Sequence, residues 1–257
     1  MRIVQIDEHP FWSVPYLNAG RDGQPHRAYL PVYRGTVDHL PAELSALILA
    51  SDLQGREDAP EDRLLGLILA EHLEMLQESG ELPPAQETGV VLAGDLYGVP
   101  GSTKRGGGGD VTEVWIAFAE RFRWVTGVLG NHDHIETKGL PENADVLDFH
   151  CIERNGLSIA GLSGIIGEPK RPNRREAHIF AEMIEILVGE APDILVLHQG
   201  PDRRPNPEPT VENALRDAQD QLVICGHAHW ETPLQGLPGN VQVLNVDARV
   251  VVLSPQR

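Results

Sequence analysis

Residues 125–133 read VTGVLGNHD, an apolar run that ends in three polar side chains, Asn131, His132 and Asp133. Four other apolar runs also end in residues that can bind a metal ion. In open α/β sheets, the loops that leave the carboxyl ends of the strands meet at one crevice, where ligands bind. The sequence therefore predicts an α/β fold with a metal site at that crevice. The four runs are LSALILASDLQG (44–55, with Asp52 and Gln54), VVLAGD (90–95, with Asp95), DILVLHQG (193–200, with His198) and LVICGHAH (222–229, with His227 and His229).

The chemistry of this residue set narrows the choice of metal. Aspartate supplies a hard anionic oxygen, asparagine a neutral carbonyl oxygen and histidine a borderline nitrogen, a mixture that suits Mn, Fe, Zn or Mg. The only cysteines, Cys151 and Cys225, are too few for a thiolate cage. The set exceeds the four ligands of a typical structural zinc site, so two divalent ions that share a carboxylate are the simplest arrangement. Such ions lie about 3.5–4 Å apart and stabilise the attacking and leaving oxygens at phosphorus.

Each short motif taken alone has a simpler explanation. Gly-Asp and Gly-Asn are common in turns, because these residues tolerate positive φ and bond to nearby backbone groups. Five such endings in order favour a shared metal site over five independent turns.

The ordered motifs resemble those of the calcineurin-like metallophosphoesterase superfamily over roughly residues 45–230. The GNHD and GHAH blocks are the specific parts, whereas a lone Gly-Asp would be weak evidence. The resemblance implies a two-sheet αββα sandwich with the metals at one edge. The motifs are Asp52-x-Gln54, Gly94-Asp95, Gly130-Asn131-His132-Asp133, His198 and Gly226-His227-Ala228-His229.

The resemblance also implies a role for each motif residue. Asp95 would bridge the two metals, with Asp52 and His229 on the first metal. The second metal would be held by Asn131, His198 and His227. A hydroxide between the metals would attack phosphorus, since divalent ions lower the pKa of bound water toward neutrality. His132 would meet the leaving oxygen as a general acid or charge stabiliser.

Gln54 departs from the superfamily pattern, in which the first motif is Asp-x-His. Glutamine offers only a neutral carbonyl oxygen, a weaker ligand than imidazole for borderline metals. We therefore expect the first site to bind metal more weakly and to prefer harder ions such as Mn or Mg. A stricter alternative is partial loss of the first metal, which would leave a slow enzyme or none.

A second departure bears on the substrate. Protein Ser/Thr phosphatases of the superfamily carry GDxVDRG, but residues 94–101 read GDLYGVPG, with Gly98 in the place of the second aspartate. This difference favours the small-molecule phosphoesterases and phosphodiesterases over the phosphoprotein phosphatases.

The segments between the motifs predict alternating strands and helices. Apolar residues recur at helical spacing in 61–79, 111–122 and 173–188, and Thr210 is a plausible N-cap for a shorter helix over 210–220. Two pairs of segments are expected to form antiparallel hairpins, 145–153 with 156–164 and 241–246 with 249–254. The pattern indicates mostly parallel sheets with helices outside. We expect residues 1–257 to form a single domain.

Residues 1–44 precede the first motif as an N-terminal extension of uncertain role. Residues 2–6 and 32–36 are expected to form strands, with an irregular aromatic loop, FWSVPYLNAGRDGQPH (11–26), between them. An ordered extension of the sheet is favoured over a lid or an oligomer contact, because aromatic residues commonly fill cores and seams.

Two loops are candidates for substrate contact. Residues 102–110, STKRGGGGD, join two basic residues, Lys104 and Arg105, to a flexible glycine run, and residues 200–210 contain Arg203 and Arg204. Basic side chains suit phosphate oxygens, although most basic residues in polar loops are simply solvated.

The composition excludes some kinds of partner. A formal charge of −17 disfavours long nucleic acids, whose binding depends on neutralising phosphates, and it also disfavours anionic membranes. The sequence contains no apolar stretch of transmembrane length, and MRIVQIDEHP lacks the features of a signal peptide. A cytoplasmic location is therefore the default expectation, and the oligomeric state stays open.

These observations predict a dinuclear metal-dependent phosphodiesterase, with Mn as the favoured metal and a small organic diester or a nucleotide as substrate. The alternatives are a phosphomonoesterase or nucleotide pyrophosphohydrolase, and a non-catalytic or sensory protein that binds phosphoesters. Two bound ions would favour the enzyme, whereas one ion with tight nucleotide binding and no turnover would favour the sensor.

Overall fold

The computed structural model describes residues 1–201 and 209–256 of the chain. Its larger sheet has the strand order β1-β3-β18-β4-β5-β7-β9, and β2 also pairs with β3. The central strands β4, β5, β7 and β9 run parallel, and β18 joins β3 to β4. The strands are β1 (Ile3–Ile6), β2 (Trp12–Ala19), β3 (Pro25–Val37), β4 (Ala46–Ser51), β5 (Thr88–Leu92), β7 (Trp124–Gly127), β9 (Ala144–Val146) and β18 (Arg249–Pro255).

The second sheet has the order β10-β11-β14-β15-β17-β16, in which β11, β14, β15 and β17 are parallel. Two short strand pairs, β6 with β8 and β12 with β13, lie outside the two sheets. The remaining strands are β6 (Gly109–Asp110), β8 (Asp133–His134), β10 (His150–Arg154), β11 (Leu157–Leu162), β12 (Ile165–Ile166), β13 (Arg174–Arg175), β14 (Ile194–Gln199), β15 (Leu222–Gly226), β16 (Leu234–Leu237) and β17 (Val241–Asn245).

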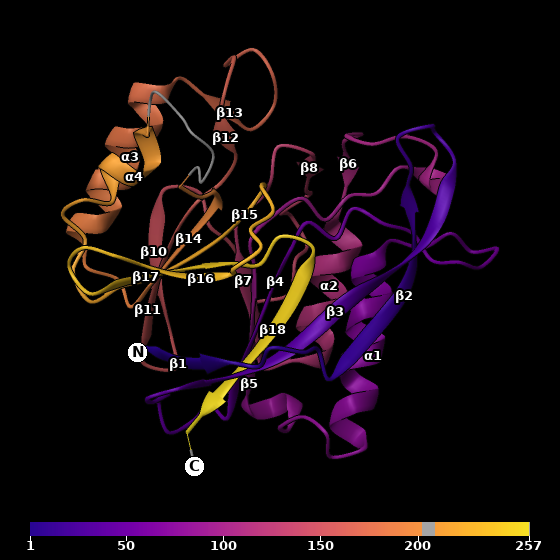
Figure 1. Ribbon diagram of the computed structural model, residues 1–257, viewed down its shortest axis with the longest axis horizontal. Helices are drawn as coiled ribbons and strands as arrows, with labels where there is room; N and C mark the ends of the chain where they lie inside the picture. Colours follow the sequence, from indigo (N-terminus) through magenta and orange to yellow (C-terminus); the bar gives the residue numbers. More distant parts are fainter. Residues whose placement is uncertain (202–208, 257) are drawn as a thin grey trace.

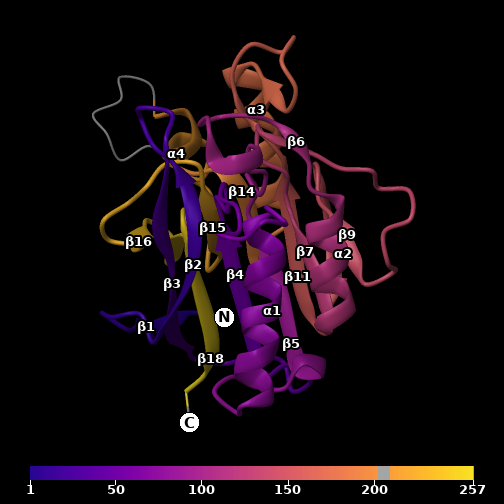
Figure 2. The ribbon, with the colours of Figure 1, turned by 90° about the vertical axis from the view of Figure 1, so that its right-hand side faces the viewer.

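Helices cover the outer face of each sheet. Figure 1 shows α3 and α4 on one side of the molecule and α1 and α2 on the other, with the sheets between them. In Figure 2 the helix α1 lies over the strands of the larger sheet. The α-helices are α1 (Leu65–Glu78), α2 (Thr112–Arg121), α3 (Ala177–Gly189) and α4 (Thr210–Ala214), and short 3-10 helices span Ala85–Glu87 and Pro100–Ser102.

Three apolar cores hold these layers together. One lies between α1, α2 and the larger sheet, the second between the two sheets, and the third between α3, α4 and the smaller sheet. Every residue of β4 is buried because both faces of the strand are covered, which explains its continuous apolar run. The predicted αββα sandwich is therefore confirmed.

The helices agree with the sequence pattern in their centres and differ at their ends. The helix α1 buries apolar residues at the expected spacing, including Leu65, Leu69 and Leu73. The helix α3 begins at Ala177, later than predicted, because Arg174–Arg175 form β13 and pair with β12. The helix α4 is shorter than predicted and has Pro209 rather than Thr210 at its N-cap. None of the helices in the described part of the chain is long and apolar enough to span a membrane.

Two predictions about strands were wrong. Residues 11–26 do not form an irregular loop, because β2 pairs with β3 from Trp12 to Ala19 in a regular antiparallel hairpin. The expected hairpin between 241–246 and 249–254 is also absent, because β17 belongs to the smaller sheet and β18 to the larger one. The predicted pairing of 145–153 with 156–164 is confirmed from His150 onward by β10 and β11, whereas residues 145 and 146 belong to β9 of the larger sheet. The ordered sheet extension expected for residues 1–44 is present as β1, β2 and β3.

Candidate metal centre

The predicted ligands follow or end parallel strands of both sheets. Asp52 follows β4, Asp95 lies in the loop after β5, His198 is in β14, and His227 follows β15. Asp52, Asp95 and His227 have positive φ values of 55°, 54° and 67°. Positive φ is uncommon for residues other than glycine, although Asp and His adopt it more readily than most, and it occurs often at functional sites.

Gly94 allows two of these loops to approach closely. Its φ is +89°, and a Cβ atom there would lie 2.4 Å from the backbone nitrogen of Gly130 and 2.9 Å from Nδ1 of His198. Any side chain would therefore separate the loops that carry Asp95 and Asn131. The glycine of the Gly-Asp motif is thus required by packing as well as by its backbone conformation.

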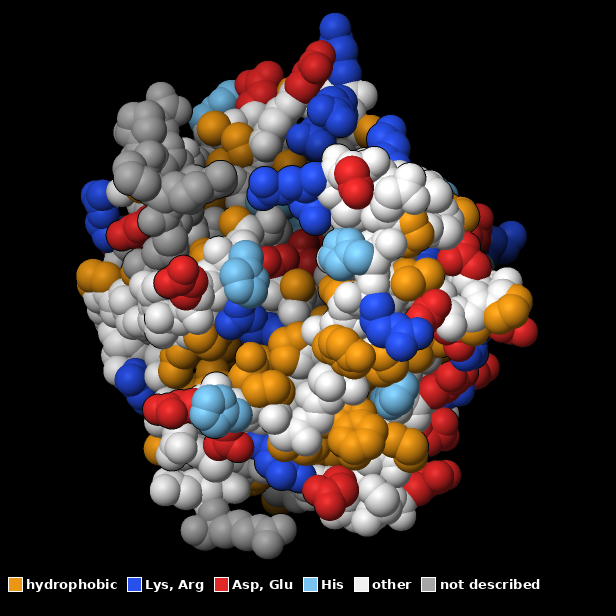
Figure 3. All heavy atoms as spheres, turned by 45° about the vertical axis from the view of Figure 1, so that its right-hand side comes forward, with side chains coloured by type: hydrophobic (Ala, Val, Ile, Leu, Met, Phe, Trp, Pro, Cys, Tyr) orange, Lys and Arg blue, Asp and Glu red, His pale blue; other side chains and the backbone are white. Residues whose placement is uncertain are grey.

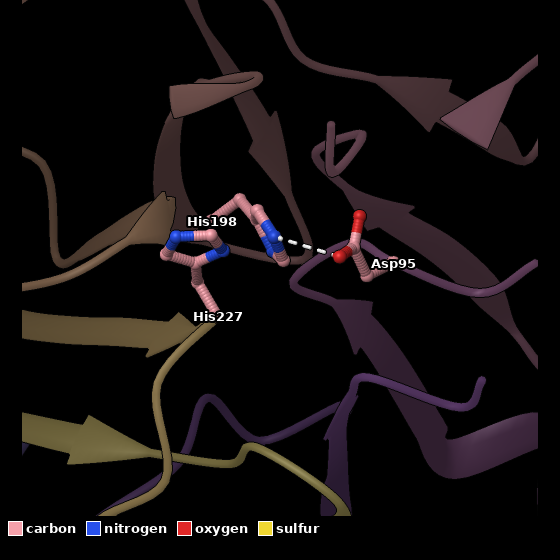
Figure 4. A group of neighbouring side chains, drawn as sticks. All are labelled: Asp95, His198 and His227. Carbon is pink, nitrogen blue, oxygen red and sulfur yellow. Dashed lines mark ion pairs between the residues drawn. The ribbon is translucent and has the colours of Figure 1, made fainter. Parts of the chain in front are cut away.

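Three of the predicted ligands form one compact group. One ligand atom each from Asp95, His198 and His227 lies within 4.8 Å of the others. Figure 4 shows His198 between His227 and Asp95, and the His198 Nε2 to Asp95 Oδ2 distance is 3.4 Å. The rings of His198 and His227 meet edge to face, with centroids 5.1 Å apart. The group combines carboxylate oxygen and imidazole nitrogen, which suits a divalent transition metal.

Two buried atoms in this region lack a hydrogen-bond partner among the described residues, Asn131 Oδ1 and His198 Nε2. The other ring nitrogen of His198, Nδ1, lies 2.7 Å from the carbonyl oxygen of Ala93. A donor N–H at Nδ1 orients the ring and directs Nε2 toward a metal, as is usual for histidine ligands. Buried polar atoms without partners are costly, so these two fit the predicted second metal site.

The charges of the group are strongly coupled. Burial opposes a charge on His198, but the carboxylates of Asp95 and Asp52 outweigh it and raise the pKa of the imidazole to about 10. Burial also opposes ionisation of Asp95, yet His198 and His132 hold its pKa at about 2. Burial and the positive charge of His198 lower the pKa of His227 to about 4. In the absence of a metal, His198 therefore carries the proton of this group.

His132 lies beside the metal ligands. Its backbone N–H donates to Asp95 Oδ1 at 2.9 Å, and its Nε2 lies 4.0 Å from Asp95 Oδ2. The next residue, Asp133, is buried and accepts hydrogen bonds from the backbone N–H groups of Leu96, Tyr97 and Gly130. Burial and the nearby Asp95 raise the pKa of Asp133 to about 6. Asp133 thus ties the GNHD loop to the Asp95 loop and positions His132, a role that the sequence motifs did not reveal.

The residues predicted for the first metal have protein partners instead. Asp52 Oδ2 accepts from Ser51 Oγ at 2.7 Å and from the backbone N–H of His227 at 2.9 Å. Gln54 Nε2 donates to Asp95 Oδ2 at 3.0 Å. Its amide nitrogen, rather than its oxygen, therefore faces the predicted bridging carboxylate.

His229 is also engaged by the protein. Its Nδ1 lies 3.1 Å from Asp247 Oδ2, and a terminal nitrogen of Arg249 lies 3.2 Å from Nδ1 and 3.0 Å from Nε2. The structure thus brings His229 to the same edge of the sheets as the other ligands but pairs it with Asp247, in the crossing between β17 and β18, and with Arg249, the first residue of β18. At the second site Asn131 Oδ1 has no hydrogen-bond partner among the described residues, whereas His229 of the first site would have to exchange partners to bind a metal.

Replacing Gln54 by His is expected to strengthen the first site. An imidazole is a better ligand for borderline metals than an amide, and it would remove the amide donor from Asp95. We expect first-site affinity for Mn²⁺ or Zn²⁺ to rise by about ten- to a hundredfold, the range that changes around a metal typically produce. Calorimetric metal titrations of both proteins would measure this, and identical affinities would remove the basis for a weakened first site.

Gly98 has no room for the side chain found in protein phosphatases. A Cβ atom there would lie 2.6 Å from the carbonyl oxygen of Gly55, and the Gly98 carbonyl accepts from Arg56 Nε at 2.7 Å. The loop is therefore closed against Gly55 rather than open to an aspartate at this position.

The variant Gly98→Asp is accordingly expected to lose about 1–3 kcal/mol of stability through overpacking. Urea denaturation would measure the change. The matched control is Gly189→Asp at the end of α3, where an added Cβ would meet no atom within 4 Å. That control is expected to shift stability by no more than about 0.5 kcal/mol, and equal losses in both variants would contradict the packing argument.

Of the residues predicted to contact substrate, only Lys104 can be placed. It is exposed and lines a cavity together with Asp52, Gln54 and His229. Arg203 and Arg204 lie outside the described residues. On one face of the molecule, acidic side chains are visible in a hollow between histidines, with basic side chains beside them (Figure 3).

Several residues of this region were not predicted from the sequence. Tyr16, Asn18 and Asp247 line the same cavity as Lys104, which is also lined by Arg105 of the predicted 102–110 loop. Only Asp247 left a signal in the sequence, because it ends the apolar run VQVLNV in the manner of the five runs described above. Arg174, in β13, lies near enough to His227 for its charge to contribute to the lowered pKa of that histidine, after burial and His198.

Known proteins are similar to this chain in family and in fold. The family described as calcineurin-like phosphoesterase matches residues 47–231. The structure of TT1561 from Thermus thermophilus aligns with a TM-score of 0.51 at 16% identity, over 80% of this chain and 90% of that one. A sulfate thiohydrolase, SoxB, from Thermus thermophilus aligns with a TM-score of 0.44 at 14% identity, over 84% of this chain and 58% of that one. No match was found among curated proteins.

Proposed function

Because the chain belongs to the calcineurin-like phosphoesterase family, we propose that it is a metal-dependent phosphodiesterase that hydrolyses a small organic phosphodiester or a nucleotide. The family makes it a phosphoesterase, a hydrolase, and the preference for diesters is our inference. We further propose two divalent metal ions as cofactors, with Mn²⁺ favoured by the mixed oxygen and nitrogen ligands, and a cytoplasmic location.

The observation that carries the proposal is the buried Asn131 Oδ1, which has no hydrogen-bond partner among the described residues, beside the compact group of Asp95, His198 and His227. A fold without a metal would leave this oxygen unsatisfied at a cost of about 1–3 kcal/mol. Asp95, Asn131, His198 and His227 would hold the second metal. Asp52, Gln54 and His229 would hold the first metal, and Asp95 would contribute to both metal sites.

When bound, the ions supply an activated water and neutralise charge on the phosphoryl oxygens. The protein residues position the groups that take part in the reaction. Asp95 is fixed through the backbone N–H of His132, and Asp133 holds the loop that carries that histidine. His132 is thereby placed to donate a proton to, or stabilise charge on, the leaving oxygen.

The substrate class follows from the shape and charge of the molecule. Gly98 is closed against Gly55, so the aspartate found in protein phosphatases has no counterpart here. The cavity beside Gln54 has a volume of about 510 Å³, within the usual range for small-molecule sites. The formal charge of −17 disfavours a long nucleic acid substrate.

The test is hydrolysis of bis-p-nitrophenyl phosphate by metal-stripped protein over a Mn²⁺ titration. We expect turnover that depends on Mn²⁺ and is lost in Asn131→Ala, because that variant removes a metal ligand. The matched control is Asn213→Ala on the exposed surface of α4, which should retain turnover. Absence of turnover at saturating Mn²⁺ would contradict the diesterase and favour a phosphomonoesterase or a non-catalytic binding protein.

A further inference from the structure

A cavity of about 510 Å³ opens beside the predicted first metal site. Asp52, Gln54 and His229 line one part of it. It is also lined by Tyr16 and Asn18 of β2 and by the loop that contains Lys104 and Arg105. The family match begins at residue 47, so the wall formed by β2 lies outside the part of the chain that the family describes.

The hairpin of β2 and β3 is fixed in place at this wall. Leu17 exchanges two backbone hydrogen bonds with Arg56, at 2.7 and 3.0 Å. The Ser102 hydroxyl donates to the Leu17 carbonyl at 2.8 Å, and Arg105 Nε donates to the Ala19 carbonyl at 2.7 Å. The hairpin and the 102–107 loop are therefore bound to each other and to the segment that follows Gln54.

Two side chains of β2 bring polar groups to this cavity. Side chains two residues apart in a strand share a face, and Val14, Tyr16 and Asn18 follow this spacing from the apolar core to the cavity. Tyr16 is 8% exposed, and no hydrogen bond joins its hydroxyl to another described residue. A nearly buried tyrosine usually finds a partner for its hydroxyl, so this group has a free hydrogen bond to offer a ligand.

The cavity is lined by two basic side chains, Lys104 and Arg105, in an otherwise acidic protein. Neither Lys104 nor Arg105 forms an ion pair with another described residue, although Arg27, Arg34 and Arg63 all do so on the surface. Gly106, the next residue, has its backbone near His132, because a Cβ atom there would lie 3.5 Å from His132 Cε1. The loop that carries these two basic residues is thus adjacent to the proposed catalytic histidine.

We propose that this cavity binds the organic part of a nucleotide-sized phosphoester that carries a second anionic group. Tyr16 and Asn18 contact the organic part, and Lys104 and Arg105 contact the second anion. The proposal rests on the proposed function, in which the scissile phosphate lies at the metal centre. Its new content is the substrate class and the role of the N-terminal hairpin as a specificity element.

The test compares two ligands that differ by one anionic group, adenosine 5′-monophosphate and adenosine 3′,5′-bisphosphate. Their dissociation constants are measured by calorimetry on Mn²⁺-loaded full-length protein. The wild type is expected to bind the bisphosphate about tenfold more tightly, as one charge-assisted hydrogen bond would provide. In Lys104→Ala this preference should fall below about threefold, whereas Lys138→Ala, an exposed lysine outside the cavity, should keep it.

A second pair of variants tests the hairpin. Tyr16→Phe removes only the hydroxyl and should weaken both nucleotides by about three- to tenfold without changing their ratio. Its control is Tyr29→Phe, an exposed tyrosine on β3, which should leave both dissociation constants unchanged.

Equal affinities for the two nucleotides in the wild type, or a preference that survives Lys104→Ala, would overturn the proposal. Failure of the proposed function has a different signature, which is absence of bis-p-nitrophenyl phosphate hydrolysis. A Lys104-dependent preference without hydrolysis would support the cavity and contradict the proposed diesterase. Hydrolysis without a preference for the bisphosphate would support the proposed diesterase and contradict the proposed role of the cavity.

Discussion

The variant His132→Asn is expected to hydrolyse an alkyl phosphodiester about 100- to 10,000-fold more slowly than the wild type while it keeps its affinity for metal. The reason is geometric. The backbone N–H of His132, which asparagine preserves, holds Asp95 Oδ1 at 2.9 Å, whereas the imidazole lies beside the ligands with Nε2 4.0 Å from Asp95 Oδ2. The substitution therefore removes the proton donor and leaves the metal ligands in place.

Substrates with different leaving groups distinguish proton donation by His132 from charge stabilisation by His132. The p-nitrophenolate anion is stable without a proton, so loss of a general acid should slow bis-p-nitrophenyl phosphate much less than an alkyl diester. The measurement is kcat for both substrates in the wild type and in His132→Asn, with bound Mn²⁺ counted in each protein. Equal losses for the two substrates would assign charge stabilisation to His132, and unchanged kcat values would exclude it from the chemistry.

The part of the site that follows buried strands was predictable from the sequence. Asp52, Asp95 and His227 each end a continuous apolar run, and the parallel strands of both sheets direct these ends to one edge. Such runs are apolar throughout because both faces of the strand are covered, so the point at which they stop is well marked. The αββα arrangement of the layers, by contrast, was expected only from the resemblance of the motifs to the superfamily.

The contribution of Asp247 was not predicted, because alternation and turn signals do not show which sheet a strand joins. Segments 241–246 and 249–254 look like a local hairpin, yet β17 pairs with β15 and β16, and β18 pairs with β3 and β4. The chain crosses between the sheets at 246–248, and this crossing brings Asp247 to His229. Partners distant in sequence decide the pairing, and the local pattern carries no information about them.

The N-terminal hairpin was missed for a related reason. Prolines at positions 10, 15, 25 and 31 and glycines at 20 and 23 indicate a loop. Proline is nevertheless tolerated in edge strands, and β2 pairs only with β3 within the larger sheet. The placement of Tyr16 and Asn18 at the cavity depends on this pairing, so it could not be read from composition.

Metal affinity at the second site is expected to rise about tenfold for each pH unit between pH 6.5 and 8.5. The cause is His198, whose pKa of about 10 in the metal-free protein means that a metal must displace its proton throughout this range. The pKa of His227 is about 4 and that of Asp95 about 2, so both are already deprotonated and add no further dependence. Asn131 binds through an amide oxygen and does not titrate.

The measurement is the dissociation constant of Mn²⁺, from the electron paramagnetic resonance signal of free Mn²⁺, at three pH values in this range. A plot of its logarithm against pH should fall with a slope close to −1, one proton released for each ion bound. The control is Asn131→Ala, which should weaken binding at every pH and keep the same slope, because the titrating group is untouched. A flat profile in the wild type would show that His198 is neutral in the metal-free protein. A slope of −1 in the wild type and a flat profile in Asn131→Ala would mean that, in that variant, the metal binds without contacting His198.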